Sequence, residues 1–138
     1  MTSTLVDSNV LIDVLVGLGP WRRWSRTRLR EAVDAGDVVV NQIIFAETAI
    51  HFEDTEVVED VASLVRPTRE SIPWEAAYEA GRAHREYRRR GGGRERTLPD
   101  FLIGAHAALK GYRLLTRDPR RYRQYFPDIE IIAPDTHP

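Results

Sequence analysis

Short apolar runs alternate along the chain with longer stretches whose apolar residues recur every three or four positions. The short runs are rich in valine, leucine and isoleucine, and they predict buried strands at 4–6, 38–40, 113–116 and 130–133. The longer stretches predict helices at 10–16, 21–35, 42–50, 57–65, 74–90 and 98–110, with a short helix between the last two strands. Glycine and proline at 17, 19, 20 and 67 mark breaks, and three glycines at 91–93 form a low-complexity segment.

Strands that are this short, apolar on both faces and separated by helices are typical of a parallel sheet. The expected fold class is therefore α/β, with a short, mainly parallel central sheet covered by helices on both faces. Ligands bind such sheets beyond the carboxyl ends of the strands. Residues that follow the strands are for this reason the first candidates for function.

Length and composition narrow the class of protein. A chain of 138 residues is long enough for one domain, 1–138, with a core of its own. It has no cysteine, which excludes disulfides, thiolate zinc sites and thiol catalysis, so a metal must be held by oxygen or imidazole. No stretch approaches the ~18 apolar residues of a spanning helix, and the first residues contain no targeting segment. We expect a cytoplasmic protein without a membrane partner.

The formal net charge of −1 hides a local separation of sign. Nineteen of the 20 basic residues are arginine, which suits phosphate binding but is equally explained by a genome rich in G and C. From Arg82 to Arg96, seven arginines against two glutamates give a charge of +5, whereas 53–60 is acidic without a basic residue. Such runs are usually solvated faces.

Three aspartates stand where a predicted helix begins. Asp7 follows the first strand, Asp100 closes Thr97-Leu98-Pro99-Asp100, which has the pattern of a capping box, and Asp118 precedes a proline. An aspartate at such a position accepts backbone N–H bonds and contributes roughly 0.5–2 kcal/mol, so capping explains each one alone. Gly111 is expected to end the helix that Asp100 opens.

Glu47 has no such explanation. In a helix that Asn41 should cap, it projects between Ile43, Ile44 and Ile50, on the face expected to enter the core. A carboxylate there must be protonated, paired with an arginine or bound to a cation, because burying it bare costs many kcal/mol.

Three of the four acids, Asp7, Glu47 and Asp118, follow predicted strands and are expected at one edge of the sheet. The neutral oxygen donors beside them are Ser8, Asn9 and Thr116. These could orient waters or carboxylates, and they could equally serve in caps and turns. Asp13, almost two turns after Asp7, is better explained as a solvated helix acid. The four histidines have no metal-ligand spacing, and no G-x-S-x-G elbow offers a nucleophile.

Oxygen donors without thiolate select hard cations, Mg²⁺ or Mn²⁺, which are often completed by a substrate phosphate. The chemistry that follows is phosphodiester hydrolysis, in which an ion activates a water and stabilises the leaving oxygen. Basic residues would hold the polyanion against the acids. Candidates are the run from Arg82 to Arg96 just upstream of Asp100, which contains Arg88, Arg89 and Arg90, and the arginines around Asp118, which are Arg117, Arg120, Arg121 and Arg123.

Four segments together resemble the motifs of PIN-domain ribonucleases, and their order and spacing resemble VapC toxins of bacterial type II toxin-antitoxin modules. The segments are Val6-Asp7-Ser8-Asn9-Val10-Leu11-Ile12-Asp13, Gln42-Ile43-Ile44-Phe45-Ala46-Glu47, Asp100-Phe101-Leu102-Ile103-Gly104-Ala105-His106-Ala107 and Leu114-Leu115-Thr116-Arg117-Asp118. The resemblance covers nearly the whole chain, from Leu5 to Ala133. Asn9 stands where many relatives have serine.

This resemblance implies a PIN-like three-layer α/β/α fold and Mg²⁺- or Mn²⁺-dependent endonucleolytic cleavage of structured RNA, of the tRNA or rRNA class. It also implies a homodimer and inhibition by a cognate VapB-type antitoxin. Asp7, Glu47, Asp100 and Asp118 carry over to the catalytic, metal-binding site, with Thr116 as a supporting hydroxyl. Asp13 is left open.

Two tryptophans form a candidate surface for a protein partner. Trp21 and Trp24 begin a helix with five nearby arginines, which could grip an amphipathic segment of an antitoxin, although both rings could equally cover the core. Two other classes stay open. A receiver-like domain needs a lysine at the acids, and Lys110 is predicted at the far end of a helix. A catalytically inactive PIN-like RNA- or protein-binding module would lack RNA cleavage that EDTA abolishes.

Overall fold

In the computed structural model, residues 1–17, 19–55, 59, 63, 65–93 and 97–138 are described. The predicted helix at 57–65 lies mostly outside them. The elements are β1 (Thr4–Val6), α1 (Ser8–Val16), α2 (Arg22–Ala35), β2 (Val38–Val40), α3 (Gln42–Ala49), β3 (Thr68–Arg69), α5 (Trp74–Arg89), α6 (Leu98–Lys110), β4 (Arg113–Leu115), α7 (Arg120–Tyr125) and β5 (Ile131–Ile132). These bounds confirm the other predicted helices to within a few residues.

The five strands form one parallel sheet in the order β3-β2-β1-β4-β5. β1 lies at its centre, where Leu5 pairs with Val39 on one side and Leu114 on the other. The apolar runs of β1, β2 and β5 are buried at every position, as expected for strands covered by helices. The sequence analysis missed β3, because this two-residue edge strand is exposed and carries no apolar signal.

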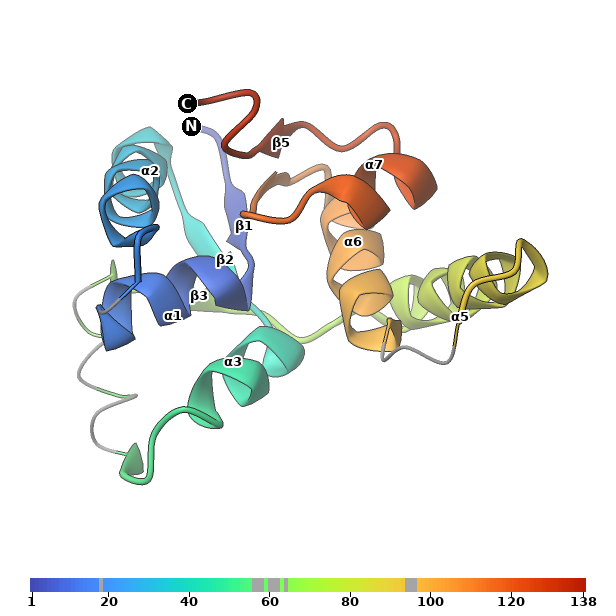
Figure 1. The fold of residues 1–138 in the computed structure, drawn as a ribbon, viewed down its shortest axis with the longest axis horizontal. Helices are drawn as coiled ribbons and strands as arrows, with labels where there is room; N and C mark the ends of the chain where they lie inside the picture. The colour runs from blue at the N-terminus through green and yellow to red at the C-terminus, as the bar shows by residue number, and fades with distance from the viewer. Residues whose placement is uncertain (18, 56–58, 60–62, 64, 94–96) are drawn as a thin grey trace.

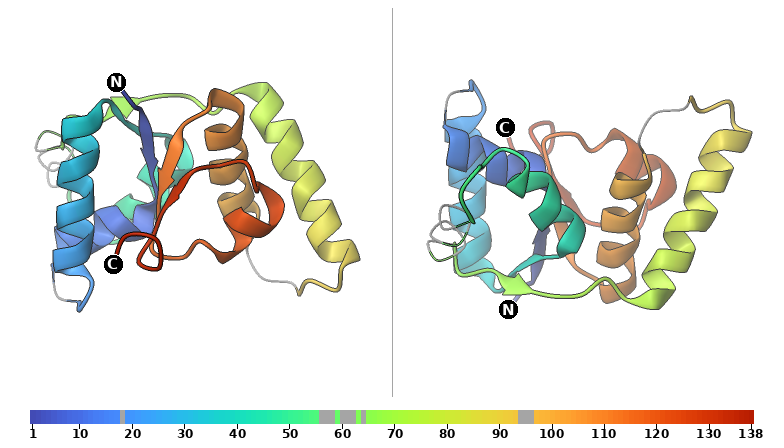
Figure 2. Two further views of the ribbon diagram at one scale, coloured as in Figure 1. Left: turned by 90° about the horizontal axis from the view of Figure 1, so that it is seen from above. Right: turned by 90° about the horizontal axis from the view of Figure 1, so that it is seen from below.

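Two apolar clusters hold the helices in place. The larger one surrounds the sheet and includes buried side chains of α1, α2, α3, α6 and α7. The smaller one joins α5 to α6 through Ala76, Ala80, Phe101 and Ala105. Figures 1 and 2 show α5 at the edge of the molecule, beyond α6. The inner face of α5 is thus fixed by small side chains, and its outer face is left to solvent.

A set of polar side chains, here called the Glu70 cluster (Asn41, Glu70, His106 and Tyr112), ties α3 and α6 to the chain after β3. Asn41 caps α3 as predicted: its Oδ1 accepts the Ile44 N–H at 3.0 Å, and its Nδ2 lies 3.0 Å from His106 Nδ1. His106 Nε2 is 2.9 Å from Glu70 Oε1, and the Tyr112 hydroxyl donates to Glu70 Oε2 at 2.8 Å. Because the backbone takes the Asn41 oxygen, its nitrogen donates to His106 Nδ1, which leaves Nε2 as the donor to Glu70.

Among the described residues, no helix is both long and apolar enough to cross a membrane.

Candidate functional site

Asp7 lies at the carboxyl end of β1 and is 5% exposed. Its Oδ1 accepts the Ser8 backbone N–H at 2.8 Å, and its Oδ2 accepts two hydroxyl groups, those of Thr116 and Tyr122, at 2.9 Å each. Burial raises the pKa of Asp7 from 3.8 to about 6, the charge of Asp100 adds to the rise, and the three hydrogen bonds oppose it. Asp7 therefore caps α1 as expected, and it is also the most deeply buried acid of the predicted quartet.

Glu47 faces Asp7 from α3. Ser8 Oγ donates to Glu47 Oε1 at 3.1 Å. Burial raises the pKa of Glu47, and the negative charges of Asp7 and Asp100 raise it further. In the described part of the chain no ion pair joins an arginine to this carboxylate, so the salt-bridge alternative has no support there.

The surroundings of Glu47 differ from the expected ones. The buried side of α3 is formed by Ile44 and Thr48, whereas Ile50 is 80% exposed. Glu47 lies beside the buried face, half-buried, and not within it. The placement between three isoleucines was wrong because the apolar residues of α3 surround the helix and do not mark a single core face.

Asp100 lies in the first turn of α6, where Arg121 Nη1 approaches its Oδ2 to 2.9 Å. Burial raises the pKa of Asp100 and the charge of Asp118 adds to the rise, while Arg121 opposes it. The predicted capping box is wrong, because the Thr97 hydroxyl lies 2.8 Å from His84 Nδ1 and caps no backbone N–H.

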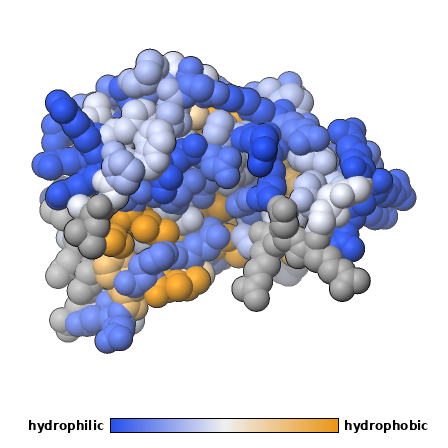
Figure 3. Space-filling view, viewed as in Figure 1, coloured by the Kyte–Doolittle hydropathy of each residue, from blue (hydrophilic) through white to orange (hydrophobic). Residues whose placement is uncertain are grey.

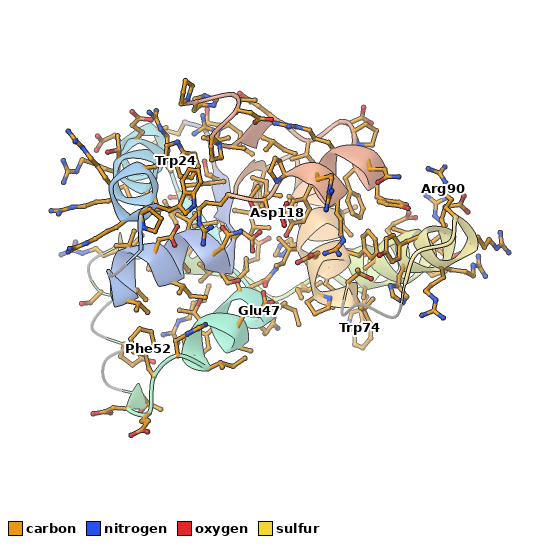
Figure 4. The ribbon with its side chains drawn as sticks, in the orientation of Figure 1. Trp24, Glu47, Phe52, Trp74, Arg90 and Asp118 are labelled. Carbon is orange, nitrogen blue, oxygen red and sulfur yellow. The ribbon has the colours of Figure 1, made fainter. Side chains whose placement is uncertain are left out.

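Asp118 follows β4 and is exposed. Its backbone N–H donates to Thr116 Oγ1 at 3.1 Å, and α7 begins after Pro119 without a side-chain cap. Thr116 Oγ1 also lies 3.3 Å from Asn9 Nδ2, and Asn9 Oδ1 accepts the Arg117 N–H at 3.2 Å. The predicted neutral donors thus link Asp118 to Asp7. Figure 4 shows Glu47 and Asp118 near the middle of the molecule, between α1, α3 and α6.

Asp13 is turned away from the other acids. Its Oδ2 accepts from Ser25 Oγ and from Arg117 Nε, at 2.6 Å each, and its side chain is 9% exposed. The expectation of a solvated helix acid was wrong, since the arginine comes from a distant segment. Arg117, a predicted RNA contact, is occupied by this ion pair, and its guanidinium also lies 5.7 Å from the centre of the Trp21 ring.

Two residues of α7 reach the site: Arg121, one of the basic residues expected around Asp118, and Tyr122, which sequence reasoning did not assign to it. Burial raises the pKa of Tyr122 well above its usual range, and the charges of Asp7 and Asp100 add to this, so its hydroxyl stays protonated and donates. A Cβ on Gly104 would lie 2.5 Å from Phe126 Cδ2 and 3.1 Å from Tyr122 Cδ1. The glycine therefore lets Tyr122 of α7 and the adjacent Phe126 pack closely against α6. It does not leave an open space above Asp100. Tyr122 follows Asp118 by four residues, and this spacing is the sequence feature that could have pointed to its place at the site.

Three arginines followed by the glycines at 91–93 suggest a mobile basic arm, and the described part of this segment does not have that form. Arg88 and Arg89 belong to the last turn of α5, and Arg90 pairs with Glu86 at 3.1 Å. Gly92 N donates to the Tyr87 carbonyl at 2.9 Å, which ties the first glycines to the helix end. Residues 94–96 lie outside the described residues. Figure 4 places Arg90 at the far end of α5 from Trp74.

Trp24 has a structural contact that the sequence did not predict. Its Nε1 donates to the His137 carbonyl at 2.6 Å, and its ring packs against the larger core cluster. Trp21 is 39% exposed and meets Trp24 edge-on, with 6.2 Å between ring centres. Trp24 therefore covers the core and secures the C-terminal segment, which leaves Trp21 as the more accessible ring.

The family assignment follows from the sequence match and agrees with this geometry. The profile described as PIN domain matches residues 4–127. The chain belongs to the PIN domain family. No curated protein sequence matches the chain.

The fold of this PIN domain also matches solved structures along nearly its whole length. VapBC2 from Rickettsia felis, bound to a promoter DNA fragment, has a TM-score of 0.72 at 14% identity, covering 96% of this chain and 98% of that chain. VapBC-1 from nontypeable Haemophilus influenzae gives 0.71 at 16%, again covering 96% and 98%. FitAcB from Neisseria gonorrhoeae gives 0.67 at 18%, covering 94% and 96%. At these identities the likeness concerns the fold.

The donor set of this PIN domain fits a hard divalent cation. Asp7, Glu47 and Asp100 offer carboxylate oxygens, and each has a raised pKa, as expected for acids that are partly buried near one another. As the described side chains stand, no three acids or histidines are gathered closely enough to hold a metal. Ser8 holds Glu47 and Arg121 holds Asp100, so both carboxylates would have to leave these partners to share an ion.

Proposed function

We propose that this PIN domain is a Mg²⁺- or Mn²⁺-dependent endoribonuclease and the toxin of a toxin-antitoxin pair. The observation that carries the proposal is the excess of negative charge at the carboxyl edge of the sheet. Three carboxylates there have raised pKa values, and within the described residues a single ion pair, Arg121 with Asp100, brings a cation to them. A divalent cation would stabilise such a group, and phosphodiester hydrolysis is the reaction that carboxylate-held ions serve.

In this proposal Asp7, Glu47 and Asp100 would hold the ion, and Asp118 would act at one remove. The ion would supply an activated water and neutralise the charge that develops on the phosphate. The chain orients these acids: Thr116 and Tyr122 fix Asp7 Oδ2, and Ser8 occupies Glu47 Oε1. Once released by Ser8, Glu47 would hold the ion through one carboxylate oxygen and take the proton of the attacking water with the other.

The test is cleavage of a structured RNA, such as total tRNA, by the purified protein with Mn²⁺ and with EDTA. We expect cleavage with Mn²⁺ alone, and a loss of at least about 100-fold in Asp7→Asn, since disturbing a metal's outer-shell partners already costs 10–100-fold. Asp128→Asn, which alters an exposed acid away from the site, is the matched control. Cleavage by wild type in EDTA, or equal cleavage by Asp7→Asn, would contradict the proposal and favour a binding module.

The RNA would be held by arginines at the end of α5. A groove of about 450 Å³ between α5 and α7 is lined by Arg82, Arg85, Arg89 and Arg90, together with Tyr125. Phosphate contacts make affinity fall with salt, so replacing Arg89 and Arg90 by glutamine should reduce the slope of log affinity against log salt by up to about 2. Fluorescence anisotropy with labelled RNA measures the slope. An unchanged slope would assign these residues to a solvated face.

Two surfaces suit protein partners. Figure 3 shows apolar side chains exposed over α1 and α3, where Val16 is 41% and Ile50 80% exposed. We assign this face to an antitoxin segment, because the solved structures with this fold include VapBC and FitAcB complexes.

On the outer face of α5, Trp74 is 89% and Tyr78 72% exposed, and we assign these rings to a homodimer contact. Trp74→Arg should then convert a dimer to a monomer in sedimentation velocity, and an unchanged sedimentation coefficient would move the contact elsewhere.

A further inference from the structure

Arg121 lies at the acidic edge, the name used here for the group formed by Asp7, Glu47, Asp100 and Asp118. Its guanidinium lies 2.9 Å from Asp100 Oδ2 and 5.9 Å from the centre of the Tyr87 ring. The next residue, Tyr122, donates to Asp7. Consecutive residues of α7 thus serve two different acids, one with a neutral donor and one with a full positive charge.

The two contacts differ in how firmly they are held. Tyr122 is 2% exposed, and its hydroxyl donates to the buried Asp7. The Arg121 and Asp100 side chains are 29% and 31% exposed, so water screens their pair, and the long arginine stem can turn without disturbing the core. Arg117, which precedes Asp118 in the sequence, is engaged by Asp13. Within the described residues, Arg121 is therefore the cation paired with the acids that can be exchanged.

We propose that Arg121 is an exchangeable counter-ion of Asp100, which it releases to a divalent cation before turning to a phosphate of the RNA. This rests on the proposed function. Once a divalent cation is bound to the Asp100 carboxylate, that carboxylate attracts the Arg121 guanidinium less strongly. A phosphate brought to the ion offers Arg121 two oxygens in the planar geometry that suits a guanidinium. The arginine thus contributes to RNA binding when metal is present and competes with metal when RNA is absent.

The first measurement is Mn²⁺ binding by isothermal titration calorimetry. Because Arg121→Gln removes the competing cation, its Mn²⁺ dissociation constant should fall several-fold below that of wild type. Arg120→Gln is the matched control, since it removes the same charge from the same helix at an exposed position, and its affinity should stay at the wild-type value. If Arg121 only braces Asp100, the affinity of Arg121→Gln for Mn²⁺ will be unchanged or weaker, which overturns the proposal.

The second measurement is the affinity for a labelled structured RNA, with EDTA and with Ca²⁺ as a divalent ion that limits cleavage. Arg121→Gln should bind RNA about tenfold more weakly than wild type in Ca²⁺ and equally well in EDTA, where Asp100 holds the wild-type guanidinium. An equal loss under both conditions would indicate a structural role and contradict the exchange. Arg121→Met keeps the apolar stem against Tyr87, and it replaces Arg121→Gln in both measurements if that variant does not fold.

The two proposals fail separately. If wild type binds Mn²⁺ but cleaves no RNA, the nuclease function is wrong, and tighter Mn²⁺ binding by Arg121→Gln still supports the counter-ion. If wild type cleaves RNA and Arg121→Gln matches Arg120→Gln in both affinities, the exchange alone is wrong. If wild type does not bind Mn²⁺, both are wrong.

Discussion

The acidic edge and the Glu70 cluster use the same residue types in opposite ways. Glu70 also loses water, which raises its pKa, but hydrogen bonds from His106 and Tyr112 and the charge of Lys110 outweigh this, and its pKa is lowered. At the acidic edge burial and mutual repulsion win, and the pKa values of Asp7, Glu47 and Asp100 are raised. The charge of one cluster is balanced within the chain, while the other cluster carries an excess of negative charge.

The difference separates an acid whose charge is balanced by its neighbours from one whose charge is not. Glu70 lies 3.8 Å from Lys110 and accepts from a tyrosine and a histidine, so its charge is balanced where it lies. Asp7 has three hydrogen-bond donors against the two of Glu70, and all three are neutral. The number of hydrogen bonds therefore does not explain why the pKa of Asp7 is the raised one, whereas the balance of charge does.

The largest expected contrast between the clusters is in pH dependence without metal. Because the pKa of Asp7 is raised from 3.8 to about 6, its protonated form stabilises the fold fully below pH 3.8, and this stability is lost as pH rises through about 6. The shift corresponds to about 3 kcal/mol. Urea unfolding in EDTA between pH 4 and 8 should show the fall in wild type and a much flatter profile in Asp7→Asn.

The Glu70 contribution has the opposite sign. Because the pKa of Glu70 is lowered, its stabilisation is present above its ordinary value and is lost as pH falls through the folded value, below about pH 4.5. Asp7→Asn should leave that acid limb unchanged. A wild-type profile in EDTA that is flat from pH 4 to 8 would mean that the two clusters do not differ in charge balance.

Removing Glu70 should cost stability and spare activity. Glu70→Ala leaves the His106 N–H and the Tyr112 hydroxyl without their acceptor, so we expect a loss of about 2 kcal/mol in the free energy of unfolding. RNA cleavage at a temperature where the variant is folded should be nearly unchanged. Glu130→Ala, at an exposed acid, serves as the comparison. A large loss of cleavage by folded Glu70→Ala would assign this cluster to function.

The smallest expected effect tests the neutral donors of Asp7. Tyr122→Phe keeps the ring beside Gly104 and removes one of the two hydroxyl donors to Asp7 Oδ2. We expect Mn²⁺ to bind about tenfold more weakly, as for other outer partners of metal ligands, with a stability change of about 1 kcal/mol. Calorimetric titration measures the affinity. Unaltered binding would show that Thr116 and Ser8 are sufficient to hold Asp7.

The sequence predicted the parallel sheet and most helices because these depend on local patterns. Runs such as Val38–Val40 mark a buried strand by themselves, and an acid directly after a strand has its place set by the topology. Contacts between distant segments left no such pattern. The pairs Arg117 with Asp13 and Arg121 with Asp100 join residues 104 and 21 positions apart, so nothing in the sequence near either acid pointed to its partner.

The arrangement of the acidic edge depends on the absence of a side chain at Gly104. With any other residue there, a Cβ would press on Phe126 and Tyr122 and push the last helix outward from α6. That displacement would withdraw a phenol from Asp7 and a guanidinium from Asp100 together, because both come from the same turn of chain. An uncharged methyl group added at this position, on a helix surface that touches no ligand, would therefore change the electrostatic surroundings of both acids.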